Sequence, residues 1–524
     1  MAAFTYPGVY IEEIPSGVHT ITGVATSIAA FVGWAAMGPT NEATLVQNWS
    51  EFQNQFGGLD SRSYLGYAVN QFFANGGQQA YIIRVVWDGT LKAAAGTPVA
   101  CASAAATVGK TLPLFASSPG VWGNSLQVTV TPQAADATRF SVTVQKVVNA
   151  STVVLENFFN LSANATDAEY VVTTIDHDSQ YITFVDPSTG NPPASLKGTP
   201  SAASGVALTG GLDGDTLNPQ DGINGDGNFE VALMSSATAG VQLLDRVDIF
   251  NLLCVPGETD APTISTLQQY CHTHRAFYIV DPPQTATTHN LEGSGPVGTT
   301  AGSITGTNSI NSAYYYPWIQ APDPLFGNRP ALFPPCGFIA GIYANTDATR
   351  GVWKAPAGIE ASLTGVSGLQ YNLTDAENGS LNPQAINCLR EFRVYGDVVW
   401  GARTLQGNDQ AGSQWKYVPI RRLALFLESS LYDGTQWVVF EPNDERLWSQ
   451  IRLNVGAFMQ GLFLQGAFQG TTPQQAYFVK CDSENNPQAS IDLGIVNILV
   501  GFAPLYPAEF VVIQIQQMAG QVQS

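Results

Sequence analysis

The stretch VDIFNLLCVPGETDAPTISTLQQYCHTHRAFYIVDPP, residues 247–283, decides the class of fold. Its pattern predicts a strand over VDIFNLLCVPG, a helix over APTISTLQQYCHTH and a second strand over RAFYIVDPP. A strand, a helix and a strand in succession are typical of α/β proteins. The centre of the chain therefore predicts an α/β domain.

A similar succession of predicted strands and helices occurs earlier in the chain. IAAFVGWA (28–35) and QAYIIRVV (79–86) predict strands. Between them, NWSEFQNQFGG predicts a short helix with Ser50 as its N-cap and Gly57-Gly58 at its end, and YLGYAVNQFFANGG predicts a second helix that ends at Gly76. This order of elements also indicates an α/β unit.

Residues 91–205 have a different composition, dominated by Ala, Thr, Ser, Gly and Pro. Apolar and polar residues alternate in SLQVTVTP, FSVTVQKVV, STVVLENFF and QYITFVD, and this predicts an inserted antiparallel β domain. Farther along, residues 284–311 are rich in Thr, Gly and Ser and predict a loop.

The last segment, from about residue 361, mixes helices and strands. Helices are expected over LNPQAINCLREF (381–392, capped by Asn382), over VPIRRLALFLESSLYDG (418–434), and from Asp444 onward, capped by Asn443. Strands are expected over TQWVVFE (435–441), QAYFVKCD (475–482), IDLGIVNILVGFAP (491–504) and EFVVIQIQQ (509–517). The carboxylates of EPNDE are therefore expected to serve a helix start, where negative charge complements the helix dipole.

Composition excludes several kinds of partner. The 524 residues are enough for three or four domains, only 12% of them are charged, and the net charge is -20. This balance argues against binding to nucleic acid or to anionic membrane surfaces. The uncharged residues 14–41 contain turn residues and do not predict a membrane span. The six cysteines form no CxxC pair, so reduced, buried thiols are expected, and no secretory signal is evident.

The sequence contains no recognisable set of catalytic residues. His272 and His274 lie two apart and do not share a helix face, which argues against a metal site. TVGKT (107–111) lacks the first glycine of a phosphate-binding loop, and GLDGDTLNPQDGINGDGN (211–228) lacks the order of a calcium loop. Asp176 and Asp178 carry carboxylates, but the residues around them form no catalytic motif. We therefore expect no enzyme, no metal and no cofactor.

At both ends of the chain, successive side chains alternate between two faces, as they do in a β-strand. The candidate N-terminal arm holds Val9, Tyr10, Ile11 and Glu12, and the candidate C-terminal arm holds Phe510, Val511, Val512, Ile513, Gln514 and Ile515. Such segments either complete a sheet of their own chain or add a strand to the sheet of a neighbour. Head-to-tail donation of strands does not close on itself, so it builds filaments.

Several stretches carry a family resemblance. They are YPGVYIEEIPSGVHTITGVATSIAAFVG (6–33), SSPGVWGNSLQVTV (117–130), LTGGLDG (208–214), VWKAPAG (352–358), LNPQAINCLREF, VVWGARTL (398–405), YVPIRRLALFLESSLYDGTQWVVFEPNDERLW (417–448) and CDSENNPQASIDLGIVNILVGFAPLYPAEFVVIQIQQ (481–517). With these the chain resembles the sheath proteins of contractile phage tails and, more closely, of phage-like extracellular contractile injection systems. Residues 131–205 add little to the resemblance.

The resemblance implies an assembly mechanism. Copies would stack as rings or a multi-start helix around an inner tube, starting from a baseplate and ending at a tail terminator, in a metastable extended state. Contraction would then drive the tube into a target envelope by rigid-body movement. The assembly would form in the cytoplasm as part of a tail-like particle or virion and would not insert into a membrane itself.

The resemblance also implies a division into α/β and α+β domains. An inner domain would combine residues 1–25 with 361–524, a middle α/β domain would combine 26–90 with 206–360, and residues 91–205 would form an outer antiparallel β insertion. Four arginines of the last segment are candidates for contact with the tube, namely Arg421, Arg422, Arg446 and Arg452.

Two other classes of function stay open at this stage. A capsid or surface-layer subunit would form closed shells or flat sheets, and a β-rich carbohydrate-active enzyme would need paired carboxylates in a cleft. The sequence also leaves open whether a sheath would belong to a phage virion or to an injection particle.

Overall fold

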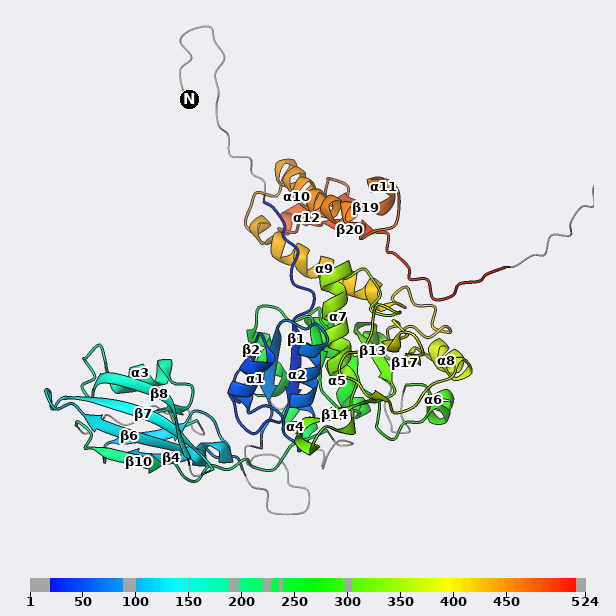
Figure 1. Cartoon of the computed structure of the whole chain (residues 1–524). Coiled ribbons are helices and arrows are strands. Elements are labelled where there is room, and N and C mark those ends of the chain that lie inside the picture. Colours follow the sequence, from blue (N-terminus) through cyan, green and yellow to red (C-terminus); the bar gives the residue numbers. More distant parts are fainter. Residues whose placement is uncertain are drawn as a thin grey trace, which may run out of the picture. The chain divides into compact units, whose positions relative to one another are not determined.

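The computed structural model describes residues 19–87, 100–149, 151–187, 196, 198–219, 228–234, 239–296 and 304–514. The chain forms two compact units (Figure 1). The larger unit is Ala25–Arg422, and the smaller one joins Met1–Val24 to Leu423–Ser524. The larger unit thus takes in residues 361–422, which the sequence placed with the inner domain. The three-domain boundaries stay a prediction.

An eight-stranded sheet organises the larger unit. Its strands, in spatial order, are β18 (Gly396–Val399), β17 (Ile386–Phe392), β13 (Ser312–Tyr316), β12 (Phe277–Val280), β11 (Leu252–Cys254), β1 (Ala29–Gly33), β3 (Ala80–Arg84) and β2 (Thr44–Val46). The six central strands are parallel, and β18 and β2 pair antiparallel at the two edges. The α/β prediction is confirmed.

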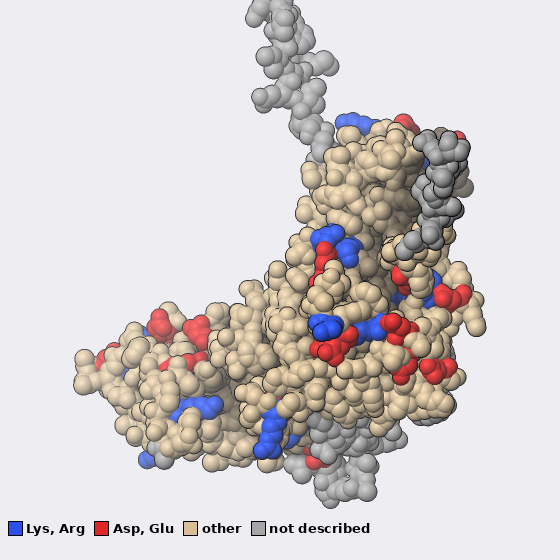
Figure 2. Space-filling model, turned by 45° about the vertical axis from the view of Figure 1, so that its right-hand side comes forward, with Lys and Arg blue, Asp and Glu red and all other residues tan. Residues whose placement is uncertain are grey.

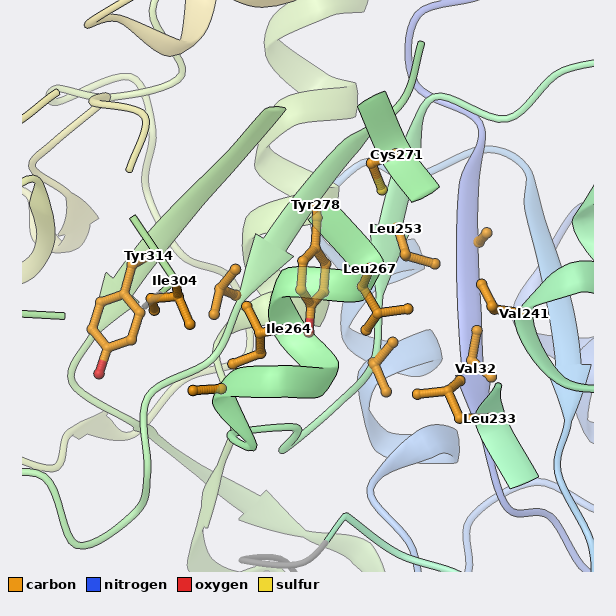
Figure 3. Close-up of a cluster of buried hydrophobic side chains, with 14 of the residues drawn as sticks. Val32, Leu233, Val241, Leu253, Ile264, Leu267, Cys271, Tyr278, Ile304 and Tyr314 are labelled. Atoms are coloured by element: carbon orange, nitrogen blue, oxygen red, sulfur yellow. The ribbon is translucent and has the colours of Figure 1, made fainter. Parts of the chain in front are cut away.

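Helices cover both faces of this sheet. On one face lie α2 (Leu65–Ala74) and α7 (Cys336–Arg350), where Phe31 meets Phe72 of α2 at 5.4 Å between ring centroids. On the other face α5 (Ala261–Thr273) packs Ile264 and Leu267 into a core with strand residues such as Val32, as Figure 3 shows. Because both faces are buried, the strands read as continuous apolar runs.

The two helices of the first face approach each other closely because α7 carries glycines. A Cβ atom at Gly337 would lie 2.4 Å from the carbonyl oxygen of Ala68, and one at Gly341 would lie 2.7 Å from that of Phe72. No side chain fits at such distances, so these two positions require glycine for close backbone packing.

Further elements of the larger unit surround the sheet. The helices are α1 (Trp49–Phe56), α4 (Asn228–Leu233), α6 (Thr288–Ser294) and α8 (Asp375–Leu381), and a small sheet joins β14 (Ile319–Asp323), β15 (Arg329–Phe333) and β16 (Gly368–Leu369). The described part of the larger unit also contains five 3₁₀ turns: η1 (Val121–Ser125), η2 (Gly240–Arg246), η3 (Thr307–Asn311), η4 (Pro324–Phe326) and η5 (Asn382–Gln384).

The β insertion has its own core. One sheet orders β10 (Ala203–Ala207), β6 (Leu126–Pro132), β7 (Arg139–Val148) and β8 (Ser151–Ser162), and another orders β4 (Ala105–Val108), β5 (Leu112–Ala116) and β9 (Ile182–Thr183), with α3 (Val171–Asp178) beside them. All of these pairs are antiparallel, as predicted. The insertion begins and ends at one place, where Ala102 and Leu212 exchange two backbone hydrogen bonds of 2.9 Å.

The smaller unit contains two long helices and a pair of short strands. Its elements are α9 (Val418–Gly434, from Leu423 onward), η6 (Gln436–Val438), α10 (Glu445–Leu464), α11 (Pro473–Ala476), β19 (Tyr477–Lys480), α12 (Gln488–Asp492) and β20 (Leu499–Phe502). Strands β19 and β20 pair antiparallel, with Tyr477 opposite Phe502.

Several local predictions are wrong. LNPQAINCLREF is not a helix: η5 is followed by Ala385 at a positive φ of 67° and then by β17, whose first four residues are buried in the sheet. TQWVVFE is the turn η6 and not a strand. Residues 284–311 contain α6. In IDLGIVNILVGFAP the first two residues end α12, and only Leu499–Phe502 form a strand, β20.

Two predicted helix caps are also displaced. Asn48 and not Ser50 caps α1, since its side chain accepts the N–H of Glu51 at 2.9 Å. Asp444 and not Asn443 caps α10, since its side chain accepts the N–H of Leu447 at 3.0 Å. Asn443, the expected cap, instead accepts the indole N–H of Trp448 at 2.8 Å and so also contacts the first turns of the helix.

Arg84 ties the end of β3 to neighbouring loops. Its guanidinium donates to the carbonyl oxygens of Ala35, Gly38 and Pro119 at 2.7, 2.7 and 2.9 Å. Burial lowers the pKa of Arg84 to about 10, so the group stays charged at neutral pH.

We expect Arg84→Ala to lower the free energy of unfolding by about 3 kcal/mol or more, because it leaves three buried carbonyl groups without a donor. Thermal unfolding followed by circular dichroism measures the effect. Arg393→Ala, at an exposed arginine of the same unit, is the matched control. Equal melting temperatures for both variants would contradict the assigned role of Arg84.

Candidate assembly surfaces

The candidate C-terminal arm is extended and exposed where it is described. Phe510, Val511, Val512 and Ile513 are between 74% and 82% exposed, and Gln514 is exposed too. None of these residues pairs with a strand in the part of the chain that the structure describes. Ile515 lies outside the described residues, and so does the whole candidate N-terminal arm, Val9–Glu12. A run of exposed apolar side chains of this kind marks a surface for another protein.

Strands β19 and β20 form a sheet of only two strands. Such a sheet is marginal on its own and needs more strands or a helix behind it. Part of that support comes from α10, because the hydroxyl of Tyr477 donates to Gln460 Oε1 at 2.9 Å and Arg452 donates to the carbonyl of Cys481. The outer edges still present backbone groups that a further strand can pair with.

An asparagine cluster fixes the loop between the two strands. The side chain of Asn486 is almost fully buried and accepts the N–H of Asn497 at 2.6 Å. Asn485 donates to the carbonyls of Lys480 and Asn497 at 3.1 and 2.8 Å. These contacts hold the start of the β20 segment against the end of β19. The sequence analysis missed them, although the run of asparagines in CDSENN was a visible signal.

Two of the four candidate tube-contact arginines are buried within the larger unit. Arg422 forms a bidentate ion pair with Asp347, at 2.6 and 2.9 Å, and lies over the ring of Tyr343. Arg421 donates to Asn311 Oδ1 at 2.8 Å and lies over Trp415. Both guanidinium groups therefore have partners inside their own chain.

The other two candidates lie on α10. Arg446 is exposed and makes no hydrogen bond or ion pair with another described residue. Arg452 is one third exposed and pairs with Glu445 at 2.6 Å. The structure does not bring the four arginines together, and their contact with a tube stays a prediction.

The surface carries few charged side chains. Figure 2 shows that uncharged residues cover most of the visible face, in keeping with the 12% of charged residues in the sequence. A surface with so little charge has little to keep copies of the chain apart.

Buried carboxylates lie at the carboxyl ends of the parallel strands, where open α/β sheets usually bind ligands. Asp281 follows β12 and accepts the N–H groups of Gly257 and Cys336 at 3.0 and 2.8 Å, so it joins two loops. Glu258 follows β11 and accepts the N–H of Asp260 at 2.7 Å through one oxygen. The other oxygen of Glu258 is buried without a partner.

The cavity beside this edge is too small for a ligand. It is lined by residues such as Pro256 and measures about 10 Å³, barely the size of one water molecule. Across the described ranges, no group of three His, Cys, Asp or Glu side chains could hold a metal ion, and no helix is long and apolar enough to cross a membrane.

The other chemical candidates have structural contacts. Asp176 accepts the N–H of Phe184 at 2.6 Å, and Asp178 lies 2.6 Å from the ring of His177. His274 ends α5 as its C-cap. Cys254, Cys271, Cys336, Cys388 and Cys481 are buried and form no disulfide, as expected of reduced, buried thiols, whereas Cys101 is only partly buried.

Comparison with known proteins assigns this chain to a protein family. Residues 237–405 match the sequence profile of the phage tail sheath protein central domain, and residues 410–518 match that of the phage tail sheath C-terminal domain. Together they take in more than half of the chain. The chain belongs to the phage tail sheath protein family. This is a family of structural proteins, and the family resemblance seen in the sequence is confirmed.

One curated relative in this family is the tail sheath protein of Vibrio phage KVP40. It is 30% identical over 169 residues, which are 32% of this chain and 24% of the relative. The chain therefore matches about a quarter of the length of this phage sheath protein.

Solved structures share the fold over almost the whole chain. The sheath complex of the PVC extracellular contractile injection system, in its contracted state, has a TM-score of 0.57 at 22% identity and covers 99% of both chains. A sheath tail protein from Listeria innocua has a TM-score of 0.59 at 13% identity, and the match covers 93% of this chain and 96% of that one. The mixed, multidomain α/β architecture is thus that of sheath proteins.

The burial of Glu258 predicts a pH-dependent stability. Burial, and next the nearby charge of Glu230, raise the pKa of Glu258 to about 8 from its ordinary value of 4.5. Between these values the unfolded chain has lost the proton and the folded chain keeps it, so stability falls as the pH rises toward 8. We expect Glu258→Gln to raise the melting temperature relative to the unmodified chain, by a margin that grows from pH 5 to pH 8.

Thermal unfolding at several pH values measures that margin. Glu42→Gln, at an exposed glutamate, is the control and should show no such growth. A constant margin for Glu258→Gln across the pH range would contradict a protonated Glu258 in the folded state.

Proposed function

We propose that this chain is the structural subunit of a contractile sheath. Copies polymerise as stacked rings or a multi-start helix around an inner tube, remain extended and metastable, and contract to drive the tube through a target envelope. The observation that carries the proposal is the exposed apolar segment 510–514, which has no strand partner among the described residues, together with the two-stranded sheet β19–β20. Membership of the sheath family supports the same function.

The arm and the sheet fit each other chemically. An extended segment gains affinity from main-chain hydrogen bonds when it adds to an open sheet edge, and its alternate side chains then face one side. In the C-terminal arm Val511 and Ile513 face one way, while Phe510, Val512 and Gln514 face the other. The arm of one copy would therefore extend the β19–β20 sheet of the next copy, and the N-terminal arm would do the same from the other end of the chain.

Strand exchange of this kind suits a contractile assembly. Hydrogen-bonded arms keep neighbouring copies linked while compact bodies rotate and slide past one another. The free energy for contraction would come from contacts between copies that form only in the contracted state, so no nucleotide is required. This accounts for a subunit without catalytic machinery.

We favour an extracellular injection system over a phage virion as the source of this sheath. The supporting observation is that the sheath chain of an injection system matches this chain in structure over 99% of both chains. Free cysteines are compatible with assembly inside the producing cell, where thiols stay reduced. The baseplate and a terminator would bound the sheath at its two ends.

Contact with the inner tube is proposed for Arg446 and Arg452. Both lie on α10, and Arg446 presents an exposed guanidinium with no partner among the described residues. An exposed positive charge on a chain of net charge -20 would suit an acidic tube surface. The guanidinium groups of Arg421 and Arg422 are already paired inside the larger unit, so a contact of these two residues with the tube is not part of this proposal.

We expect the chain expressed alone to form wide hollow tubes in negative-stain electron microscopy, and deletion of residues 508–524 to leave folded subunits that form none. A finer variant replaces Val511 and Val512 together by proline. Adjacent residues point their N–H groups in opposite directions, so one lost N–H must belong to the new strand pair. The control replaces both by threonine, which keeps the N–H groups and the strand propensity.

Tubes of normal length from the deletion or from the proline pair would contradict strand donation. Closed shells or flat sheets from the unmodified chain would indicate a different kind of structural protein. Monomers under all conditions, including co-expression with the tube protein, would contradict the sheath function itself.

We expect Arg446→Glu to weaken binding to the inner tube several-fold at low salt and by less at high salt, because an exposed ion pair is screened. Co-sedimentation of folded subunits with assembled tube protein measures the binding. Arg393→Glu makes the same charge change at an exposed arginine elsewhere and is the control. Equal binding of the two variants would exclude Arg446 from the tube contact.

A further inference from the structure

The turn between α9 and α10 presents an exposed aromatic side chain. Phe440 is fully exposed, and the preceding Val439 is more than half exposed. Phe440 also has a positive φ of 71°, a conformation that is rare for a bulky residue and that marks functional sites. We name these two side chains, Val439 and Phe440, the knob.

The turn is held in one shape by contacts at its base. The N–H groups of Val439 and Glu441 donate to the carbonyls of Gln436 and Val438, each at 3.2 Å. The ring of Trp437 stacks on that of His19, with ring centroids 4.2 Å apart. The carbonyl groups of Val439 and Phe440 have no partner among the described residues. The knob is therefore a preorganised projection with free hydrogen-bond acceptors next to its apolar side chains.

A groove in the same unit has the opposite character. It measures about 510 Å³ and is lined by apolar side chains of α9 and α10 and by the segment that follows His19, including Ile21, Phe426, Ala457, Phe458 and Gly461. Among the described residues, no Asp, Glu, Lys or Arg lines it. A pocket of this size and character takes an apolar side chain with a few polar contacts.

One buried polar group of the groove lacks a partner. Asn454 is 3% exposed, and its Oδ1 accepts the N–H of His19 at 3.2 Å. Its Nδ2 atom is buried and has no acceptor among the residues that the structure describes. An unpaired buried donor is costly, so the groove is suited to an occupant that brings a carbonyl oxygen with its apolar side chain. The knob offers this combination.

We propose that the knob of one copy inserts into the groove of a second copy, with Asn454 donating to a free carbonyl of the knob. This inference rests on the proposed function, because it assigns a contact between copies of the sheath subunit. The contact differs from strand donation, since it uses side-chain packing and neither of the two arms.

The knob and the groove are different patches of one chain, so each copy can contact two other copies. The knob precedes the first residue of α10, Glu445, and the groove runs along α10 from Asn454 to Gln465. At 1.5 Å per residue, the groove begins about 14 Å and ends about 30 Å beyond the helix start. A contact between two different patches of the same molecule is heterologous, and a series of such contacts builds a ring or a helical filament.

Cross-linking between two variants that each carry one added cysteine, with the partly buried Cys101 replaced by serine in both, tests the proposal. One variant carries Val439→Cys, which keeps Phe440, and the other carries Gly461→Cys inside the groove. An added Cβ at Gly461 meets no atom within 4 Å, so the cysteine is accommodated. Gly456→Cys is the matched control, because it lies on the same helix, has equal space and does not line the groove. The two variants are mixed, assembled into tubes and treated with a short bismaleimide.

We expect a 439–461 cross-link in the tubes, identified by peptide mass spectrometry, and at least tenfold less of the 439–456 link. Tubes without the 439–461 link would overturn the knob contact and leave the sheath function standing. A cross-link from position 439 to the tube protein in its place would also overturn it. If the unmodified chain forms no tubes even with the tube protein, the sheath function fails and this contact fails with it.

A second variant separates assembly from folding. Phe440→Gly removes the aromatic anchor and suits the positive φ, so we expect an equal or higher melting temperature of the isolated subunit. The concentration needed for tube formation should rise about tenfold or more, as is typical when a buried aromatic anchor is lost. Val394→Asp, at an exposed side chain of the β17–β18 turn, is the control. An unchanged assembly concentration for Phe440→Gly would overturn the proposal.

Discussion

The larger unit depends on one constraint, the burial of both faces of its parallel sheet. Neighbouring residues of β1 face opposite helix layers, with Phe31 against α2 and Val32 against the core that contains α5. Because a parallel sheet is stable only when both faces are covered, this single strand requires two layers of helices. Those layers in turn place the strand ends, the buried carboxylates and the loops that Arg84 joins.

The sequence predicts most of this sheet because its strands are short apolar runs with turn residues between them. It fails at β17, where Asn382 and Pro383 look like a helix start, but Ala385 takes a positive φ and Ile386–Leu389 are buried beside β13. The alternation of Val511 and Ile513 was visible as well. By contrast, the unpaired Nδ2 of Asn454 and the pairing of Arg422 with Asp347 depend on residues far apart in the sequence, so no local pattern reveals them.

The smaller unit combines several features that are incomplete in a single chain. Its two-stranded sheet has open edges, its arm has no strand partner among the described residues, its groove contains an unsatisfied donor, and its turn carries an exposed Phe440. In a protein that acts as a monomer each of these would be a liability for aggregation. Their occurrence together is expected for a subunit whose stable state is the polymer, where each incomplete feature has a counterpart on another copy.

The two ends of the β insertion meet where Ala102 and Leu212 pair side by side, and Pro119 inside the insertion also accepts a hydrogen bond from Arg84 at the end of β3. Its core is separate from that of the sheet, and its two ends meet as the two strands of a hairpin do. An exchange of everything between these residues for a short turn, or for a foreign domain with adjacent termini, would keep every strand of the parallel sheet and would remove one carbonyl that Arg84 binds, that of Pro119. This gives evolution, and protein engineering, a position at which a new domain can be inserted while the strands of the parallel sheet are kept.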